Sequence, residues 1–161
     1  MQFTFSLVLL FLSLKFSLQA SCPAPVVDYT NNFAFNGDFE LPDTNGGYIK
    51  NQPLPGWVAD TMELGRGSIY NNNWGTSQVI ELAADKNENY TKVETLTEGK
   101  YFLSLQYACR KSVPLASSGM NVYWNNNLIL SVLGPSIGNY NIHTQTFVVD
   151  AVEGQNSLTL L

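Results

Sequence analysis

Lys100–Arg110 reads KYFLSLQYACR, and no other stretch of the chain alternates so regularly. Successive side chains of a β-strand point to opposite faces, so an apolar residue at every second position marks a strand with one buried face. Gly99 provides a turn immediately before it. The apolar positions are Tyr101, Leu103, Leu105, Tyr107 and Cys109.

The same period continues along the chain on both sides of this strand. Met120–Trp124 and Leu128–Leu133 flank three asparagines, which predicts a hairpin. Thr144–Val152 and Ser157–Leu161 flank a second turn, Glu153–Asn156. No window shows the helical spacing of apolar residues, so we expect an all-β chain of two packed antiparallel sheets. Earlier strands are expected at Phe33–Phe35, Trp57–Ala59, Ser68–Tyr70, Gln78–Leu82 and Tyr90–Leu96.

The chain begins with an apolar run, Phe3–Leu14, that is shorter than the ~20 residues of a membrane-spanning helix. Small residues follow at Ala20 and Ser21, as an export cleavage site requires. We therefore expect residues 1–20 to be a signal peptide. A membrane anchor, a buried strand and a lipoprotein signal cut before Cys22 are the alternatives.

Composition then limits the number of domains and the kinds of partner. Removal of residues 1–20 would leave 141 residues, which suits one domain at 33–161 after an N-terminal extension at 21–32. The formal net charge is −5 and no cluster of Lys and Arg occurs, which argues against nucleic acid and anionic membranes as partners. We expect no membrane insertion after the signal is removed. Only 13% of residues are charged, and such a surface suits polyhydroxylated ligands.

Five motifs occur in order between Phe35 and Leu161. They are Asn36–Glu40, Pro55–Trp57, Gln78–Leu82, Tyr101–Arg110 and Val122–Asn125. Together they resemble the galactose-binding-like superfamily, especially a plant cell-wall family formerly labelled a domain of unknown function and related bacterial exported domains that resemble carbohydrate-binding modules. The resemblance implies a jelly-roll β-sandwich.

Two further expectations come from the same resemblance. Its members continue past the strand at Leu158–Leu160 into a final strand, which would be missing here; the chain would then be a fragment, or a variant that fills the open edge with another segment. Members also often hold a structural calcium near the N-terminal Phe-Glu. Glu40 and Asp38 match that position, although Glu40 could instead cap a turn or be solvated. No other cofactor is expected.

Two modifications are compatible with export. A disulfide between Cys22 and Cys109 would close a long loop and contribute ~4 kcal/mol. The alternative is that Cys109 is a buried thiol. Asn89 begins the sequence Asn-Tyr-Thr, a glycosylation site in a eukaryotic secretory pathway.

Aromatic side chains and hydrogen-bonding groups would form a sugar site, because rings stack on the apolar faces of sugars and polar groups bind the hydroxyls. Trp74 is the first candidate, since it lies in a polar Asn-rich loop. Trp57 and Trp124 are interpreted as packing residues. Arg110 and Glu81 would bind hydroxyls or pair with one another. The complete expected ligand set is Trp74, Tyr70, Arg110, Glu81 and Tyr123.

Sequence signatures of enzymes are nearly absent. His143 is the single histidine and is interpreted as a surface residue, and a glycosidase would need two carboxyls facing one cleft. We therefore expect a secreted, non-enzymatic module that binds a polysaccharide or a glycoprotein glycan at the cell wall, matrix or cell surface. The alternative is a structural or adhesion protein that uses the fold for protein contacts. An exposed Trp74 would favour sugar, and an exposed apolar edge would favour assembly.

Overall fold

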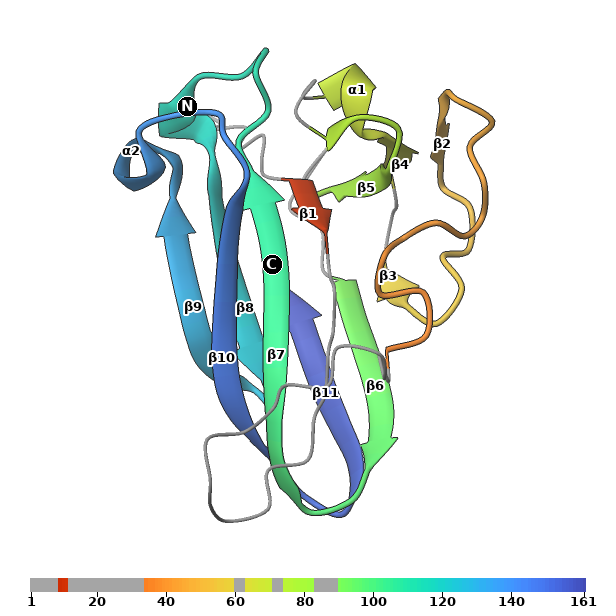
Figure 1. Ribbon diagram of the computed structural model, residues 1–161, viewed down its shortest axis with the longest axis vertical. Helices are drawn as coiled ribbons and strands as arrows, with labels where there is room; N and C mark the ends of the chain where they lie inside the picture. The colour runs from red at the N-terminus through yellow and green to blue at the C-terminus, as the bar shows by residue number, and fades with distance from the viewer. Residues whose placement is uncertain (1–8, 12–33, 60–62, 71–73, 83–89) are drawn as a thin grey trace.

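The computed structural model describes residues 9–11, 34–59, 63–70, 74–82 and 90–161. Its strands form two antiparallel sheets that face each other (Figure 1). We call the six-stranded sheet, of order β10-β7-β1-β5-β4-β2, sheet A. Its strands are β1 (Leu9–Phe11), β2 (Tyr48–Lys50), β4 (Glu63–Arg66), β5 (Gln78–Glu81), β7 (Gly99–Ala108) and β10 (His143–Ala151).

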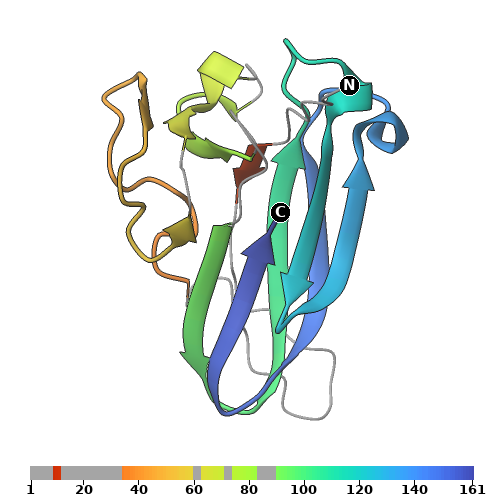
Figure 2. The ribbon, with the colours of Figure 1, turned by 180° about the vertical axis from the view of Figure 1, so that it is seen from behind.

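The second sheet, sheet B, has five strands in the order β3-β6-β11-β8-β9. It faces the viewer in Figure 2, where β6, β11, β8 and β9 lie side by side. Short helical turns also lie between strands; among the described residues these include α1 (Gly67–Tyr70), the 3₁₀ turn η2 (Leu115–Ser117) and α2 (Gly134–Ile137). The strands of sheet B are β3 (Val58–Ala59), β6 (Tyr90–Leu96), β8 (Gly119–Trp124), β9 (Asn127–Leu133) and β11 (Gly154–Leu160).

The main core lies between the sheets and is built by the alternation seen in the sequence. Alternate residues of β7 are buried in it, and β8 contributes Met120, Val122 and Trp124. Trp57 is also buried, and its Nε1 donates a hydrogen bond to the carbonyl of Asn36 at 3.1 Å. Both Trp57 and Trp124 are therefore packing residues, as the sequence indicated.

An all-β chain with two layers is confirmed, and most of the expected strands are present. β6 matches Tyr90–Leu96, and β7 to β11 lie within two or three residues of their predicted bounds. Two predictions were wrong: Ser68–Tyr70 belongs to the helical turn α1, and Ala34–Phe35 lies in a turn. The strands β2 and β4 were not predicted.

Close packing explains why Ser68–Tyr70 is not a strand. A Cβ atom on Gly67 would lie 2.0 Å from the Cβ of Trp74, so the chain here passes against the Trp74 side chain in a way that only glycine permits. The turn brings Tyr70 back over sheet A, where it is buried. Local propensity is overridden by this tertiary contact.

Part of the predicted leader lies inside sheet A. Leu9–Phe11 forms β1, which pairs antiparallel with both β5 and β7. The other residues of 1–20, and the extension at 21–32, lie outside the described residues. Among the described residues, no helix is long and apolar enough to cross a membrane.

Candidate functional site

Four of the five residues expected to bind a ligand gather on the face of sheet A that points away from the main core. Glu81 is on β5, Arg110 follows β7, and Tyr70 closes α1. Tyr70 and Trp74 share a small second core with Val79 and Ala108. Glu63 and Lys50 join them, and we call Lys50, Glu63, Tyr70, Glu81 and Arg110 the carboxylate cluster.

Arg110 and Glu81 form the best-defined pair of the carboxylate cluster. Nη1 of Arg110 donates to both Oε1 and Oε2 of Glu81, each at 2.7 Å. The guanidinium carbon of Arg110 also lies 5.2 Å from the centre of the Tyr70 ring, within cation–π range. The Glu81 side chain is 1% exposed and that of Arg110 is 30% exposed. Arg110 is therefore the member of this pair that faces solvent, and Glu81 is the buried one.

Glu63 is held in the same way by two other members of the cluster. The Tyr70 hydroxyl donates to Oε1 of Glu63 at 2.8 Å, and the Lys50 ammonium lies 2.6 Å from Oε2. These bonds satisfy both oxygens of a carboxylate that is itself buried. A buried charge is tolerated when it is paired and hydrogen-bonded in this manner.

The register of the strands places the two carboxyls together. Glu63 on β4 is the direct cross-strand partner of Glu81 on β5. The Tyr90 hydroxyl, from sheet B, donates to the carbonyl of Glu81 at 3.1 Å and accepts from the amide of Glu63 at 3.4 Å. One side chain of the opposite sheet thus ties the two backbones at the point where the carboxyls meet.

The pKa of Glu81 is raised from 4.5 to about 7. Burial is the largest cause, because it penalises the charged form, and the neighbouring Glu63 acts in the same direction. Arg110 opposes the shift without cancelling it. Burial also raises the pKa of Tyr70, and its bond to Glu63 adds to the effect. Near neutral pH the carboxyl pair therefore holds a proton for part of the time.

Trp74 is buried in the second core with 6% of its surface exposed. The prediction that it lies in an open polar loop was wrong on this point, because Trp74 folds back against Gly67 and beside Tyr70. A ring in this position cannot stack on a sugar without local opening. Residues 71–73 of the same loop lie outside the described residues.

The carboxylate cluster does not have the form of a glycosidase centre. Glycosidases place two carboxyls about 5–9 Å apart on either side of the bond that is cut. Here Glu63 and Glu81 are direct cross-strand neighbours, and each is bound by a cationic partner. The arrangement ties β4 to β5.

Tyr123 lies apart from the other expected ligand residues, on the outer face of sheet B. It stands in a row that crosses all five strands, with each member opposite the next. The hydroxyls of Thr91 and Thr159 in this row are 3.2 Å apart. We call it the outer row; its members are Val58, Thr91, Thr159, Tyr123 and Leu128.

The whole outer face around this row is uncharged at its described strand positions. The charged residues of β6, Lys92 and Glu94, take the other face, where Lys92 donates to the carbonyls of Phe35 and Gly56 at 2.7 and 3.2 Å. The outward positions hold hydroxyls, amides, one tyrosine and exposed aliphatic side chains, namely those of Val58, Val93, Leu128 and Leu133.

The expected calcium ligands do not form a suitable donor set. Oε1 of Glu40 accepts from the amide of Gln78 at 2.9 Å, and Oε2 lies 3.9 Å from the Arg66 guanidinium. Asp38 accepts from the amide of Glu40 at 3.4 Å. An arginine beside the carboxylate opposes a cation there, and no group of three acidic, His or Cys side chains among the described residues is arranged to hold a metal. The Glu40 carboxylate thus binds the first amide of β5 and lies near Arg66.

The side chain of Cys109 is buried in the main core. Burial raises its pKa, and a hydrogen bond from Ser118 moves it the other way. Cys22 and Asn89 both lie outside the described residues, so their pairing and modification stay predictions. His143 is partly exposed on the edge strand β10, where its ring stacks on Tyr107.

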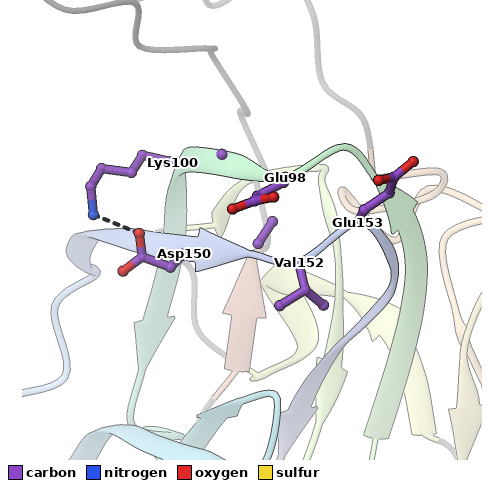
Figure 3. Close-up of a pocket in the computed structure, with 7 residues that line it drawn as sticks. Glu98, Lys100, Asp150, Val152 and Glu153 are labelled. Carbon is purple, nitrogen blue, oxygen red and sulfur yellow. Dashed lines mark hydrogen bonds and ion pairs between the residues drawn. The ribbon is translucent and has the colours of Figure 1, made fainter.

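A hollow of about 540 Å³ lies at the opposite end of the sandwich, beside the turns that join β6 to β7 and β10 to β11 (Figure 3). Glu98, Asp150 and Glu153 line it, and Lys100 pairs with Asp150 at 2.5 Å. The hollow is separate from the carboxylate cluster, which lies at the β4–β5 end (Figure 1).

Sequence reasoning named Glu63 only among the carboxylates available to a glycosidase, and it did not find Lys50. The segment that forms β4 reads ELGR, which has no alternation to mark it as a strand. A signal did exist, because Glu81 lies between apolar neighbours in the sequence and a buried carboxylate needs partners.

Comparison with known proteins gives no further guide. No family model matches the chain, and no match was found among curated proteins or among solved structures.

Proposed function

We propose that this chain is a non-enzymatic extracellular β-sandwich that works through protein contacts, as a structural or adhesion protein that associates with copies of itself. A galactose-binding-like jelly roll is the fold we propose within the observed all-β class. Three observations support self-association: the exposed edge strand β9, its lack of charge, and the burial of Trp74.

The edge strand β9 carries the proposal. In the described part of the chain, β9 pairs with β8 alone, so its other edge is open. It reads NLILSVL, with no charged residue and no proline, and Leu133 is 62% exposed. Proteins normally protect such an edge with charged residues or proline, and β9 contains neither.

A second copy of the chain is the occupant that this edge fits best. Two β9 strands can pair antiparallel about a twofold axis, which gives a closed dimer with one continuous sheet. The molecule is acidic overall, with a formal net charge of −5, and would repel itself at most surfaces. The uncharged outer face and edge of sheet B avoid that repulsion.

Substitution at Leu133 tests this proposal. A lysine there places a charge on the open edge, so Leu133→Lys is expected to convert a dimer or larger assembly to a monomer. Val152→Lys is the matched control, because Val152 is another exposed aliphatic residue in the turn between β10 and β11. Sedimentation velocity over a range of protein concentrations measures the outcome. A wild-type chain that is monomeric over the whole concentration range would contradict the proposal.

Glycan binding is the second candidate, and Tyr123 is the observation that favours it. Its half-buried ring lies between Thr159 and Leu128 on a flat, uncharged surface rich in hydroxyls and amides. Rings of this kind stack on sugar faces while neighbouring hydroxyls bond the sugar. The site would therefore be the outer row rather than the buried Trp74.

A glycan and polysaccharide array distinguishes the two candidates. Selective binding that is lost in Tyr123→Ala and kept in Tyr48→Ala would support a sugar site on the outer row. Tyr48 is a suitable control because it is exposed on β2 of the other sheet. Absence of binding by well-folded wild-type protein would rule out glycan recognition and leave self-association as the function to test.

A further inference from the structure

The strand β1 occupies a position inside sheet A, between two strands that do not pair with each other (Figure 1, red). Leu9 lies level with Glu81 of β5 and Ala108 of β7. Leu10 lies level with Ile80 and Tyr107. The segment is antiparallel to both neighbours, so its backbone lies where ladders can form on both sides.

In the described part of the chain, the ladder between β1 and β7 covers three residues, Gln106–Ala108, whereas the ladder between β10 and β7 covers nine, Gly99–Tyr107. The β1 position therefore accepts an extended segment of at least three residues at this end of β7.

The surroundings define the chemistry of the segment that fits. The residues level with Leu10, Ile80 and Tyr107, are buried in the main core. Ala108, level with Leu9, is fully buried in the second core. A charged side chain level with Ile80 and Tyr107 would lie against the main core without a partner, which is costly. The segment now in place, Leu-Leu-Phe, has the uncharged apolar character that the groove demands.

The position of β1 in the sequence matters for this groove. Leu9–Phe11 belongs to the segment 1–20 that has the sequence character of an export leader. Removal of that leader would take β1 out of the sheet. Backbone N–H and C=O groups of β5 and β7 would then lose their partners in the middle of a sheet, where unpaired groups are unfavourable.

We propose that the groove between β5 and β7 is a strand-accepting site, which in the processed protein binds an extended, uncharged, apolar segment of a partner protein. The segment runs antiparallel to both strands and completes sheet A by strand addition, with backbone hydrogen bonds giving affinity and alternate side chains giving specificity. The site lies in sheet A and is independent of the β9 edge and of Tyr123.

A cleavable full-length chain tests the groove without requiring a fragment to fold alone. A recognition sequence for a specific protease is inserted within residues 22–30, the intact protein is purified, and the leader is then cut from the folded chain. The probe is a fluorescent peptide of residues 5–14 with lysines added at both ends for solubility. The control is the same peptide with Leu10→Pro, since proline removes a ladder hydrogen bond.

Fluorescence anisotropy and hydrogen exchange of Gln106–Ala108 are the two measurements. The uncut chain is expected to bind neither peptide. The cut chain is expected to bind the unmodified peptide at least about tenfold more tightly than the proline peptide, because strand addition depends on the ladder. Protection of the Gln106–Ala108 amides should fall after the cut segment dissociates and return when the peptide binds.

Three results would overturn the proposal. Equal binding of the two peptides would indicate non-specific apolar adsorption. No binding to a cut chain whose Gln106–Ala108 amides exchange freely would show that the groove does not accept a strand. A cut segment that stays in place and never exchanges with excess peptide would show that β1 is a permanent strand of the fold. A monomeric protein with a functional groove would contradict only the self-association proposal.

Discussion

Glu63 and Glu81 lie directly opposite each other on neighbouring strands, and each binds a different basic residue. Like charges opposite one another in a sheet repel, so this pair would weaken the β4–β5 ladder if it stood alone. Lys50 and Arg110 supply the compensating charge, and the raised pKa of Glu81 reduces the repulsion further. The cluster therefore couples the stability of sheet A to pH.

The first prediction concerns that coupling. The pKa of Glu81 is raised in the folded protein from 4.5 to about 7, so its contribution to stability is fully present below pH 4.5 and is lost as the pH rises through about 7. We expect the free energy of unfolding to fall by about 3 kcal/mol over this range through Glu81.

Urea denaturation between pH 4.5 and 8 measures this contribution. Glu81→Gln cannot titrate, so its stability should change less over the range than that of the wild type. Glu153→Gln removes an exposed carboxyl and is the control, which should keep the wild-type slope. Parallel pH profiles for the wild type and Glu81→Gln would contradict the assignment.

The second prediction concerns Arg110. Its removal leaves Glu81 buried without a cationic partner, so Arg110→Ala is expected to cost about 3 kcal/mol at pH 8. The cost should be smaller at pH 5, where Glu81 is protonated and needs no counter-charge. Lys111→Ala, at the exposed neighbouring position, should change stability little at either pH. A loss that is equal at both pH values would show that packing, rather than charge, is the contribution of Arg110.

The third prediction concerns the buried amide of Gln78. Its Oε1 accepts from the amide of Thr44 at 2.6 Å, and its Nε2 donates to the carbonyls of Phe39 and Pro42 at 2.8 and 3.1 Å. These bonds fasten the loop before β2 to strand β5. Gln78→Ala leaves three backbone groups without this partner and is expected to cost about 2–4 kcal/mol in unfolding free energy.

Exposed Gln145 of β10 gives a matched control for this change. Gln145→Ala should alter the melting temperature little, whereas Gln78→Ala should lower it and increase hydrogen exchange at residues 39–44. Unchanged exchange in that loop would show that Gln78 does not hold it.

The alternation of β6, β7, β8 and β10 could be predicted from the sequence because these strands bury one face each. The outward position of Tyr123 followed from the same rule. The carboxylate cluster could be predicted only in part: a Glu81–Arg110 pair was an open alternative, but Glu63 and Lys50 join it through the β4–β5 register, which no local pattern encodes. Trp74 was misplaced because the contact with Gly67 that buries it is tertiary.

The fourth prediction concerns Asn156, which builds the turn between β10 and β11. Its Oδ1 accepts from the amide of Val152 at 3.0 Å and from Nδ2 of Asn125 at 2.9 Å. Its Nδ2 donates to the carbonyls of Val152 and Gly154 at 2.8 and 3.0 Å. One buried amide thus replaces the backbone bonds that a tighter turn would make and also ties the turn to the β8–β9 hairpin.

Asn156→Ala removes all four bonds and is expected to cost about 2–4 kcal/mol. Asn156→Asp keeps the acceptor but turns the donor into a charge that faces two carbonyls, so it should be nearly as damaging at pH 8. Its deficit should shrink as the pH falls, because the protonated carboxyl can donate to one carbonyl. Asn141→Ala, at an exposed position, should leave the denaturation midpoint almost unchanged. An Asn156→Asp protein with a deficit that is independent of pH would show that the donor side of Asn156 contributes nothing.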